Sequence, residues 1–141
     1  MNSKPFLPKR LGWIALAALL FLDAFLDVIR GAEGNPLWKP AVAIIGIEAV
    51  PFLVPLILPL FYIAVKAAGW LIKRVDRLPH AEELVLTSLV LVFAVYDIWV
   101  MSVDFLGFRL ITSHYQIIPV LIVAALAYAL SAECLIRRKR K

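Results

Sequence analysis

Five acidic residues lie within or near the long apolar stretches of this sequence, where charged side chains are rare. They are Asp23, Asp27, Glu48, Asp97 and Asp104. An ionised carboxylate is costly in the hydrocarbon of a bilayer, so such residues usually face a cavity, a partner or a bound cation. Either several of them are protonated, because desolvation and neighbouring like charges both disfavour the ionised form, or a cation binds among them.

The spacing of the acids favours a shared site. Asp23 and Asp27 are four residues apart, and Asp97 and Asp104 are seven apart, so each pair is expected on one face of a helix. Hard cations such as Ca²⁺, Mg²⁺ and Mn²⁺ take carboxylate oxygens as ligands, and a sodium ion or a proton would use the same groups. We therefore expect the five acids to form a cation- or proton-binding site. These four Asp residues are the candidate metal ligands, with a divalent cation or sodium as the candidate cofactor.

The protein's own basic residues offer an alternative way to neutralise the acids. Three of them lie on the same side of the predicted membrane, namely Arg30, Lys39 and Arg109. Their candidate partners are Asp27, Glu33 and Asp104. In that case the acids would serve interhelical hydrogen bonds and interfacial ion pairs rather than a ligand.

Membrane helices must position these residues. Of the 141 residues, 63% are apolar and only 18% are charged, and the mean hydropathy is +0.91. Soluble domains lie near half apolar and a quarter charged, so the composition indicates a membrane protein. We predict an all-α fold, a single domain over 1–141 with four transmembrane helices in an antiparallel bundle. Their expected ranges are about 11–29, 41–65 with an extension to 72, 84–106 and 116–133.

The distribution of Lys and Arg predicts the orientation of the bundle. With a cytoplasmic N-terminus, twelve of the fifteen basic residues fall on the inner side. This bias predicts a multi-pass protein of the cell membrane with both termini cytoplasmic. The formal charge of +5 is then explained by membrane flanks, and no nucleic-acid partner is expected.

The acids all fall in the outer half of the predicted bilayer. At a rise of 1.5 Å per residue, Asp27 and Asp104 lie about 5 Å below the outer boundary. By the same measure Asp23 and Glu48 lie about 10–12 Å below it and Asp97 about 15 Å. Antiparallel neighbours would bring these two layers together, so the expected site faces outward.

Polar residues near the outer ends of the helices are placed to close the mouth of such a site. They are Glu33 and Asn35 in the first outer loop and His114 before the fourth helix. Gly31 and Gly34 permit a tight backbone path in that loop.

The second helix is unusual in its prolines. Pro51, Pro55 and Pro59 recur every four residues and therefore lie near one face, where they free backbone carbonyls from helical hydrogen bonds. One interpretation is a single kinked helix from Ala41 to Ile72 whose inner part, from Lys66 onward, lies at or beyond the inner interface. The other is a discontinuous helix whose freed carbonyls help to coordinate an ion.

The first helix and its loop also carry a resemblance. The chain contains Leu22-Asp23-Ala24 and then Gly31-Ala32-Glu33-Gly34-Asn35-Pro36-Leu37. In these residues it resembles a group of small, uncharacterised prokaryotic integral membrane proteins, classed as a domain of unknown function. The resemblance covers roughly the first 40 residues, and Lys66 resembles a Lys of the group's second helix region. It implies a three- or four-helix bundle with an acidic first helix and no particular activity.

Motifs typical of membrane enzymes are missing from the sequence. Tyr96-Asp97 resembles one half of an intramembrane aspartyl protease site, but the partner Gly-x-Gly-Asp motif is absent. His80 and His114 belong to opposite sides of the membrane, so they do not flank one haem. A phosphate loop, a catalytic triad and zinc-ligand spacing are also lacking, and an enzyme is the less favoured reading.

Three functions follow from these residues. The first is a small cation- or proton-binding membrane protein, a transporter, channel or part of one. Because four helices enclose little volume, it would act as a homo-oligomer or in a larger membrane complex. The second is a non-catalytic accessory subunit whose buried acids pair with a partner's basic residues. The third and least favoured is a metal-dependent enzyme acting on lipid headgroups.

Overall fold

The computed structural model describes residues 6–32 and 38–138, and within these ranges its regular structure is entirely helical. Its elements are α1 (Lys9–Arg30), α2 (Lys39–Ile45), a 3₁₀ turn (Ile47–Ala49), α3 (Val50–Val75), α4 (Ala81–Val100), a π-helical turn (Met101–Phe105) and α5 (His114–Arg138). Four helical segments are long and apolar enough to cross a membrane: residues 9–30, 47–75, 81–105 and 114–138. The predicted all-α fold with four transmembrane helices is confirmed.

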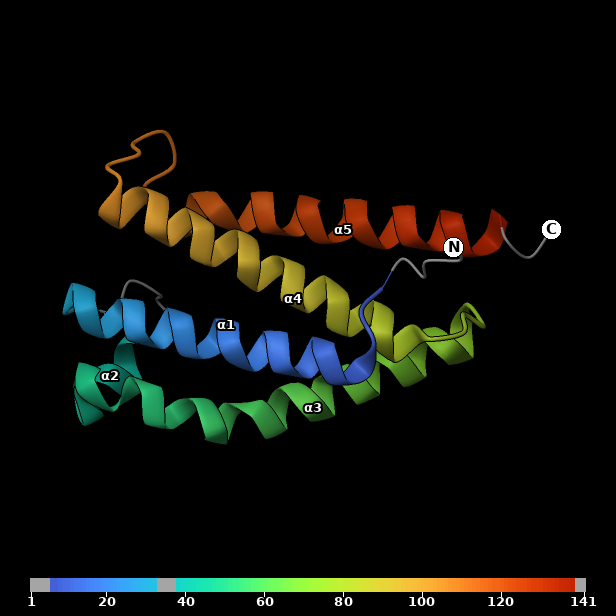
Figure 1. Ribbon diagram of the computed structural model, residues 1–141, viewed down its shortest axis with the longest axis horizontal. Coiled ribbons are helices and arrows are strands. Elements are labelled where there is room, and N and C mark those ends of the chain that lie inside the picture. The colour runs from blue at the N-terminus through green and yellow to red at the C-terminus, as the bar shows by residue number, and fades with distance from the viewer. Residues whose placement is uncertain (1–5, 33–37, 139–141) are drawn as a thin grey trace.

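Helix α4 is the central element of the bundle. It contacts α1, α3 and α5, and α1 and α3 also contact each other. Figure 1 shows the long helices side by side, with the start of α1 and the end of α5 at the same end of the bundle. Helix α5 therefore depends on α4 for most of its packing.

The helices approach closely at two glycines, which have no side chain to keep them apart. A Cβ added to Gly12 of α1 would lie 2.6 Å from Cδ2 of Leu86, and one added to Gly69 of α3 would lie 2.7 Å from Cγ of Glu82. Both neighbours belong to α4. Without a hydrophobic driving force in lipid, such close contact supplies the van der Waals energy that holds membrane helices together.

The second membrane segment is discontinuous, so of the two interpretations the single helix from Ala41 to Ile72 was wrong and the discontinuous helix is correct as to the break. The break lies at Gly46, whose φ of +85° is a conformation that L side chains rarely adopt. Pro51 follows in the first turn of α3, where its missing N–H costs no helical hydrogen bond. Pro55 and Pro59 lie inside α3, which continues through them. The interruption therefore lies before all three prolines, at Gly46.

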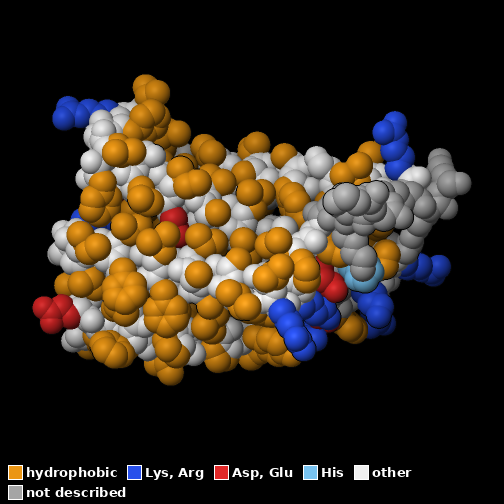
Figure 2. Space-filling view, viewed as in Figure 1, with side chains coloured by type: hydrophobic (Ala, Val, Ile, Leu, Met, Phe, Trp, Pro, Cys, Tyr) orange, Lys and Arg blue, Asp and Glu red, His pale blue; other side chains and the backbone are white. Residues whose placement is uncertain are grey.

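Large apolar side chains cover much of the outer surface of the bundle. Figure 2 shows them over the middle of the molecule, while Lys and Arg side chains gather toward one end of this face. Leu56 of α3 and Leu130 of α5 are 68% and 65% exposed. Patches of this extent on a single chain are typical of surfaces that contact lipid or another membrane protein.

The tight contact at Gly69 predicts a size limit at this position. Gly69→Leu should lower the free energy of unfolding by about 2 kcal/mol, because the new side chain meets the backbone of Glu82 as well as its side chain. Reversible unfolding of the purified protein in mixed micelles measures this difference. Ala67→Leu is the matched control, since Ala67 is exposed on the same helix. Equal destabilisation by both changes would contradict a close contact between α3 and α4.

Candidate functional site

Arg30 connects two acids, Asp27 and Asp104, at one end of the bundle. Its Nη1 donates to Oδ2 of Asp104 at 2.5 Å, its Nη2 pairs with Oδ1 of Asp27, and its Nε donates to the carbonyl of Ala32 at 2.8 Å. All three guanidinium nitrogens thus have an acceptor. The interpretation that the protein's own cations neutralise some of the acids is correct for Asp27 and Asp104.

Local structure explains why these three side chains meet. Arg30 lies in the last turn of α1, where a positive charge is favoured by the helix dipole, and Gly31 ends the helix in the left-handed conformation with φ of +70°. Asp104 lies in the π-helical turn that follows α4. Because a π turn holds more residues than an α turn, Asp104 does not keep the seven-residue register with Asp97. Both acids nevertheless interact with residues of α1, since the charge of Asp97 interacts with that of Asp23 and Asp104 pairs with Arg30.

Asp97 lies deeper and has a different environment. It is 2% exposed, and neither of its carboxylate oxygens has a hydrogen-bond donor within residues 6–32 and 38–138. Asp23 on α1 is close enough for the charges of the two carboxylates to interact. A buried carboxylate in this situation costs several kcal/mol if it is ionised and without a cation.

A cavity of about 570 Å³ lies beside α1, and Asp97 is not among its lining residues. Asp23 and Asp27 of α1 line it, together with Tyr96 of α4 and His114 of α5. Most of the remaining wall is aliphatic or aromatic and comes from α1, α3, α4 and α5. A small organic molecule fits a space of this size, and the few polar groups would set its orientation and charge.

Aromatic contacts hold the start of α5 against α4 at the edge of this cavity. The ring of His114 lies 5.0 Å from that of Trp99 and 6.0 Å from that of Tyr96. Trp99 is itself fixed, because its indole N–H donates to the carbonyl of Ile111 at 2.8 Å. His114, predicted at the mouth of the site, is one of the residues that line this cavity.

A capping box starts α5 at the point where His114 must be placed. The side-chain oxygen of Gln116 accepts a hydrogen bond from the backbone N–H of Ser113 at 3.3 Å, and Oγ of Ser113 accepts one from Tyr115 at 3.3 Å. This pattern, Ser-x-x-Gln before an apolar run, is readable in the sequence.

The structure does not gather all of the predicted site residues. Glu48 is exposed in the 3₁₀ turn and does not line the cavity. Glu33 and Asn35 lie outside the described residues. In the part of the chain that is described, no three His, Cys, Asp or Glu side chains form a group that could hold a metal ion. A metal site made by Asp23, Asp27, Asp97 and Asp104 therefore has no support in the geometry.

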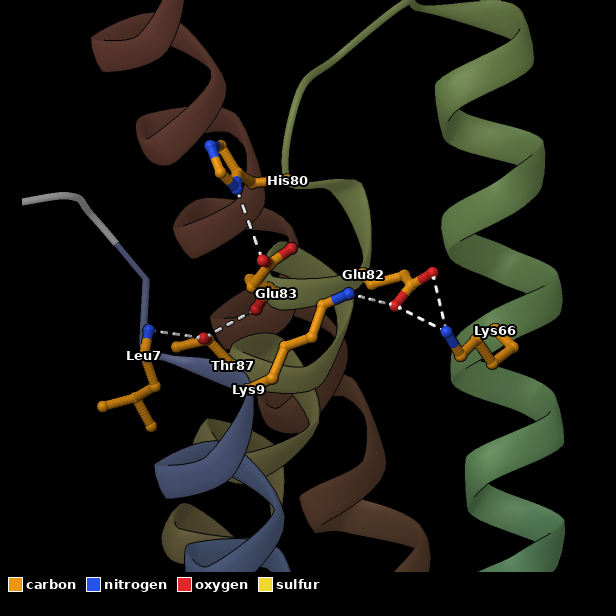
Figure 3. Close-up of polar contacts among 7 residues, drawn as sticks. All are labelled: Leu7, Lys9, Lys66, His80, Glu82, Glu83 and Thr87. Carbon is orange, nitrogen blue, oxygen red and sulfur yellow. Dashed lines mark hydrogen bonds and ion pairs between the residues drawn. The ribbon is translucent and has the colours of Figure 1, made fainter.

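Sequence reasoning missed a second charged cluster at the other end of the bundle, shown in Figure 3. The carboxylate of Glu82, in the first turn of α4, pairs with Nζ of Lys9 at 2.7 Å and with Nζ of Lys66 at 3.1 Å. The same end is tied by the backbone N–H of Leu7, which donates to Oγ1 of Thr87 at 2.9 Å. The sequence signal for this cluster was that Lys9, Lys66 and Glu82 lie near the ends of three successive apolar segments. Antiparallel packing brings these ends together at one end of the bundle.

The double ion pair of Arg30 predicts a large loss of stability when it is broken. Arg30→Gln should lower the free energy of unfolding by about 3–5 kcal/mol, because Asp27 then stays buried without its counter-charge. Adding Asp27→Asn should recover part of the loss. The control is Arg109→Gln, which removes an exposed positive charge near the same end. Additive effects of the Arg30 and Asp27 changes in a double-mutant cycle would refute the coupling.

No family model, curated protein or solved structure matches this chain. The resemblance of residues 22–37 to a group of uncharacterised prokaryotic membrane proteins stays a prediction.

Proposed function

We propose that the protein binds a proton or a monovalent cation at Asp23 and Asp97, in the outer half of a cell membrane, as a step in cation transport. The proposal includes the orientation that the Lys and Arg distribution predicts, with both termini on the cytoplasmic side. In this orientation the cavity beside Asp23 opens toward the outer half of the membrane.

One observation carries the proposal, and it is the environment of Asp97. The side chain is buried, and the described residues offer its oxygens no hydrogen-bond donor. An acid with a purely structural role would be expected to have a donor or a cation beside it, as Asp27 and Asp104 have in Arg30. Asp97 instead requires a proton or an added cation to remain in the bundle at low cost.

The geometry favours a proton or a singly charged cation over a divalent metal ion. Divalent ions such as Ca²⁺ need about six to eight oxygen ligands, and Mg²⁺ needs near-ideal octahedral geometry. Arg30 already pairs with Asp27 and Asp104, so the proposed site consists of Asp97, which is buried, and Asp23, which lines the cavity. Two carboxylates, of which Asp23 lines a mostly apolar cavity, suit a ligand of low charge.

The alternative function of an accessory subunit has less support. It requires buried acids that depend on the basic residues of another protein. For Asp27 and Asp104 that requirement is absent, because Arg30 of the same chain pairs with both.

Protonation of Asp97 predicts a spectroscopic signal. Infrared difference spectra between acidic and alkaline pH should contain a carboxyl C=O stretching band that disappears in Asp97→Asn. Asp76→Asn, which removes an exposed acid between α3 and α4, should leave this band unchanged. An identical spectrum in wild type and Asp97→Asn would show that Asp97 does not exchange a proton in this range.

Cation binding predicts stabilisation that depends on the same two acids. At a concentration near 100 times the dissociation constant, a bound cation should add about 2.7 kcal/mol to the stability of the wild type. Asp23→Asn combined with Asp97→Asn should abolish this gain, and Asp76→Asn should retain it. Thermal unfolding with sodium, magnesium, calcium, manganese or tetraphenylphosphonium as the added cation is the measurement. If no added cation stabilises the wild type, the site takes only a proton. If the infrared band is also missing, the proposed function fails.

A further inference from the structure

A second cavity lies at the inner end of the bundle, among the charged side chains of Figure 3. It measures about 190 Å³ and is lined by Lys9, Arg10, Trp13, Tyr62, Val65, Lys66, Glu82 and Leu86. These residues come from α1, α3 and α4. It is separate from the acid-lined cavity, with which it shares no lining residue.

The charged lining of this cavity is unbalanced toward the positive side. Lys9, Arg10 and Lys66 contribute three positive charges, and Glu82 contributes the single negative charge. Glu82 holds the two ammonium groups at 2.7 and 3.1 Å. Arg10 forms no ion pair with any residue in the described ranges, so its guanidinium is available for an anion. A guanidinium with neighbouring ammonium groups matches the geometry and charge of a phosphate.

The other side of the cavity is aromatic and apolar. The rings of Trp13 and Tyr62 lie 5.6 Å apart, and Nζ of Lys66 lies 5.7 Å from the centre of the Tyr62 ring. Val65 and Leu86 are buried behind them. Trp and Tyr are the residues that prefer the boundary between headgroups and hydrocarbon. The cavity thus presents cations next to the groups that contact the glycerol and upper acyl region of a lipid.

The length of α1 places this cavity at a membrane boundary. Lys9 and Arg30 stand at its two ends, about 32 Å apart at 1.5 Å per residue, which is close to the thickness of the hydrocarbon core. Helix α3 continues nine residues beyond Lys66 to Val75, about 13 Å, and so extends out of the hydrocarbon. A ligand of the cavity therefore meets the bilayer surface rather than open solution.

We propose that this inner cavity binds the phosphate of an anionic phospholipid, with Arg10 and Lys66 on the phosphate and Trp13 beside the glycerol region. The positive charge, the aromatic wall and the position at the boundary all point to this one ligand. The site does not depend on the proposed function of Asp23 and Asp97.

Native mass spectrometry of the full-length protein released from micelles tests the proposal, with dioleoyl phosphatidylglycerol as the added lipid. Wild type should retain this lipid more strongly than dioleoyl phosphatidylcholine. Arg10→Gln should weaken retention about fivefold, since one basic residue near an anionic surface contributes that order of affinity. Arg10 is the residue of choice because its removal leaves the pairs of Glu82 with Lys9 and Lys66 intact.

Lys73→Gln is the matched control, because Lys73 is an exposed basic residue of α3 beyond the cavity. Retention unchanged in Lys73→Gln and restored by Arg10→Lys would support the site. Equal loss in Arg10→Gln and Lys73→Gln would overturn it, because the attraction would then be a general effect of basic charge. Displacement of the lipid by millimolar glycerol phosphate would overturn it as well, since the site would then recognise free phosphate. Equal retention of both lipids would also contradict the proposal.

Discussion

The cost of a charge in hydrocarbon is the constraint on which this structure depends. Charged side chains of this chain form two ion-paired clusters, one at each end of α1, and so reduce this cost. At one end Glu82 joins Lys9 and Lys66, and at the other Arg30 joins Asp27 and Asp104. Because α1 has 22 residues, the two clusters are separated by about the thickness of the hydrocarbon core. Between the two clusters the surface of the bundle is largely apolar.

These clusters also connect helices that side-chain packing alone would hold weakly in lipid. Each joins α1 to the α4 segment, and the Glu82 cluster adds α3. Close approach at Gly12 and Gly69 supports the same pairs of helices. The ion pairs define the level at which the helices meet, and the glycines define how near they come. Helix α4 thereby becomes the centre of the bundle.

Against this background Asp97 is the exception. The other buried acid, Asp27, has an internal counter-charge, whereas Asp97 has no hydrogen-bond donor in the described part of the chain. A bundle that neutralises its other buried acid has retained one buried carboxyl in a costly position, next in sequence to Tyr96, which lines the large cavity. Such an arrangement is typical of functional residues in membrane proteins. The inner cavity is different in kind, because its charge is positive and it lies at the boundary.

Composition and spacing alone determined the all-α fold, the number of helices long and apolar enough to cross a membrane, and the presence of acids within the apolar segments. Hydrophobic length and the cost of buried charge are local properties, so they can be read residue by residue. Gly46, where the second membrane segment breaks, and the Ser-x-x-Gln pattern at Ser113 are also present in the sequence. The interpretations of that segment were based on its prolines rather than on Gly46.

Only the tertiary structure decided which acids are neutralised and which are not. Their shallow positions made Asp27 and Asp104 candidate partners of basic residues, but that Arg30 pairs with both depends on the π turn that carries Asp104. The Glu82 cluster likewise joins residues that are 16 and more positions apart. Such pairings arise from helix rotation and register, which spacing within one segment does not define. For that reason the five acids predicted as one site fall into three groups: Asp27 and Asp104, which pair with Arg30; Asp23 and Asp97, whose charges interact; and the exposed Glu48.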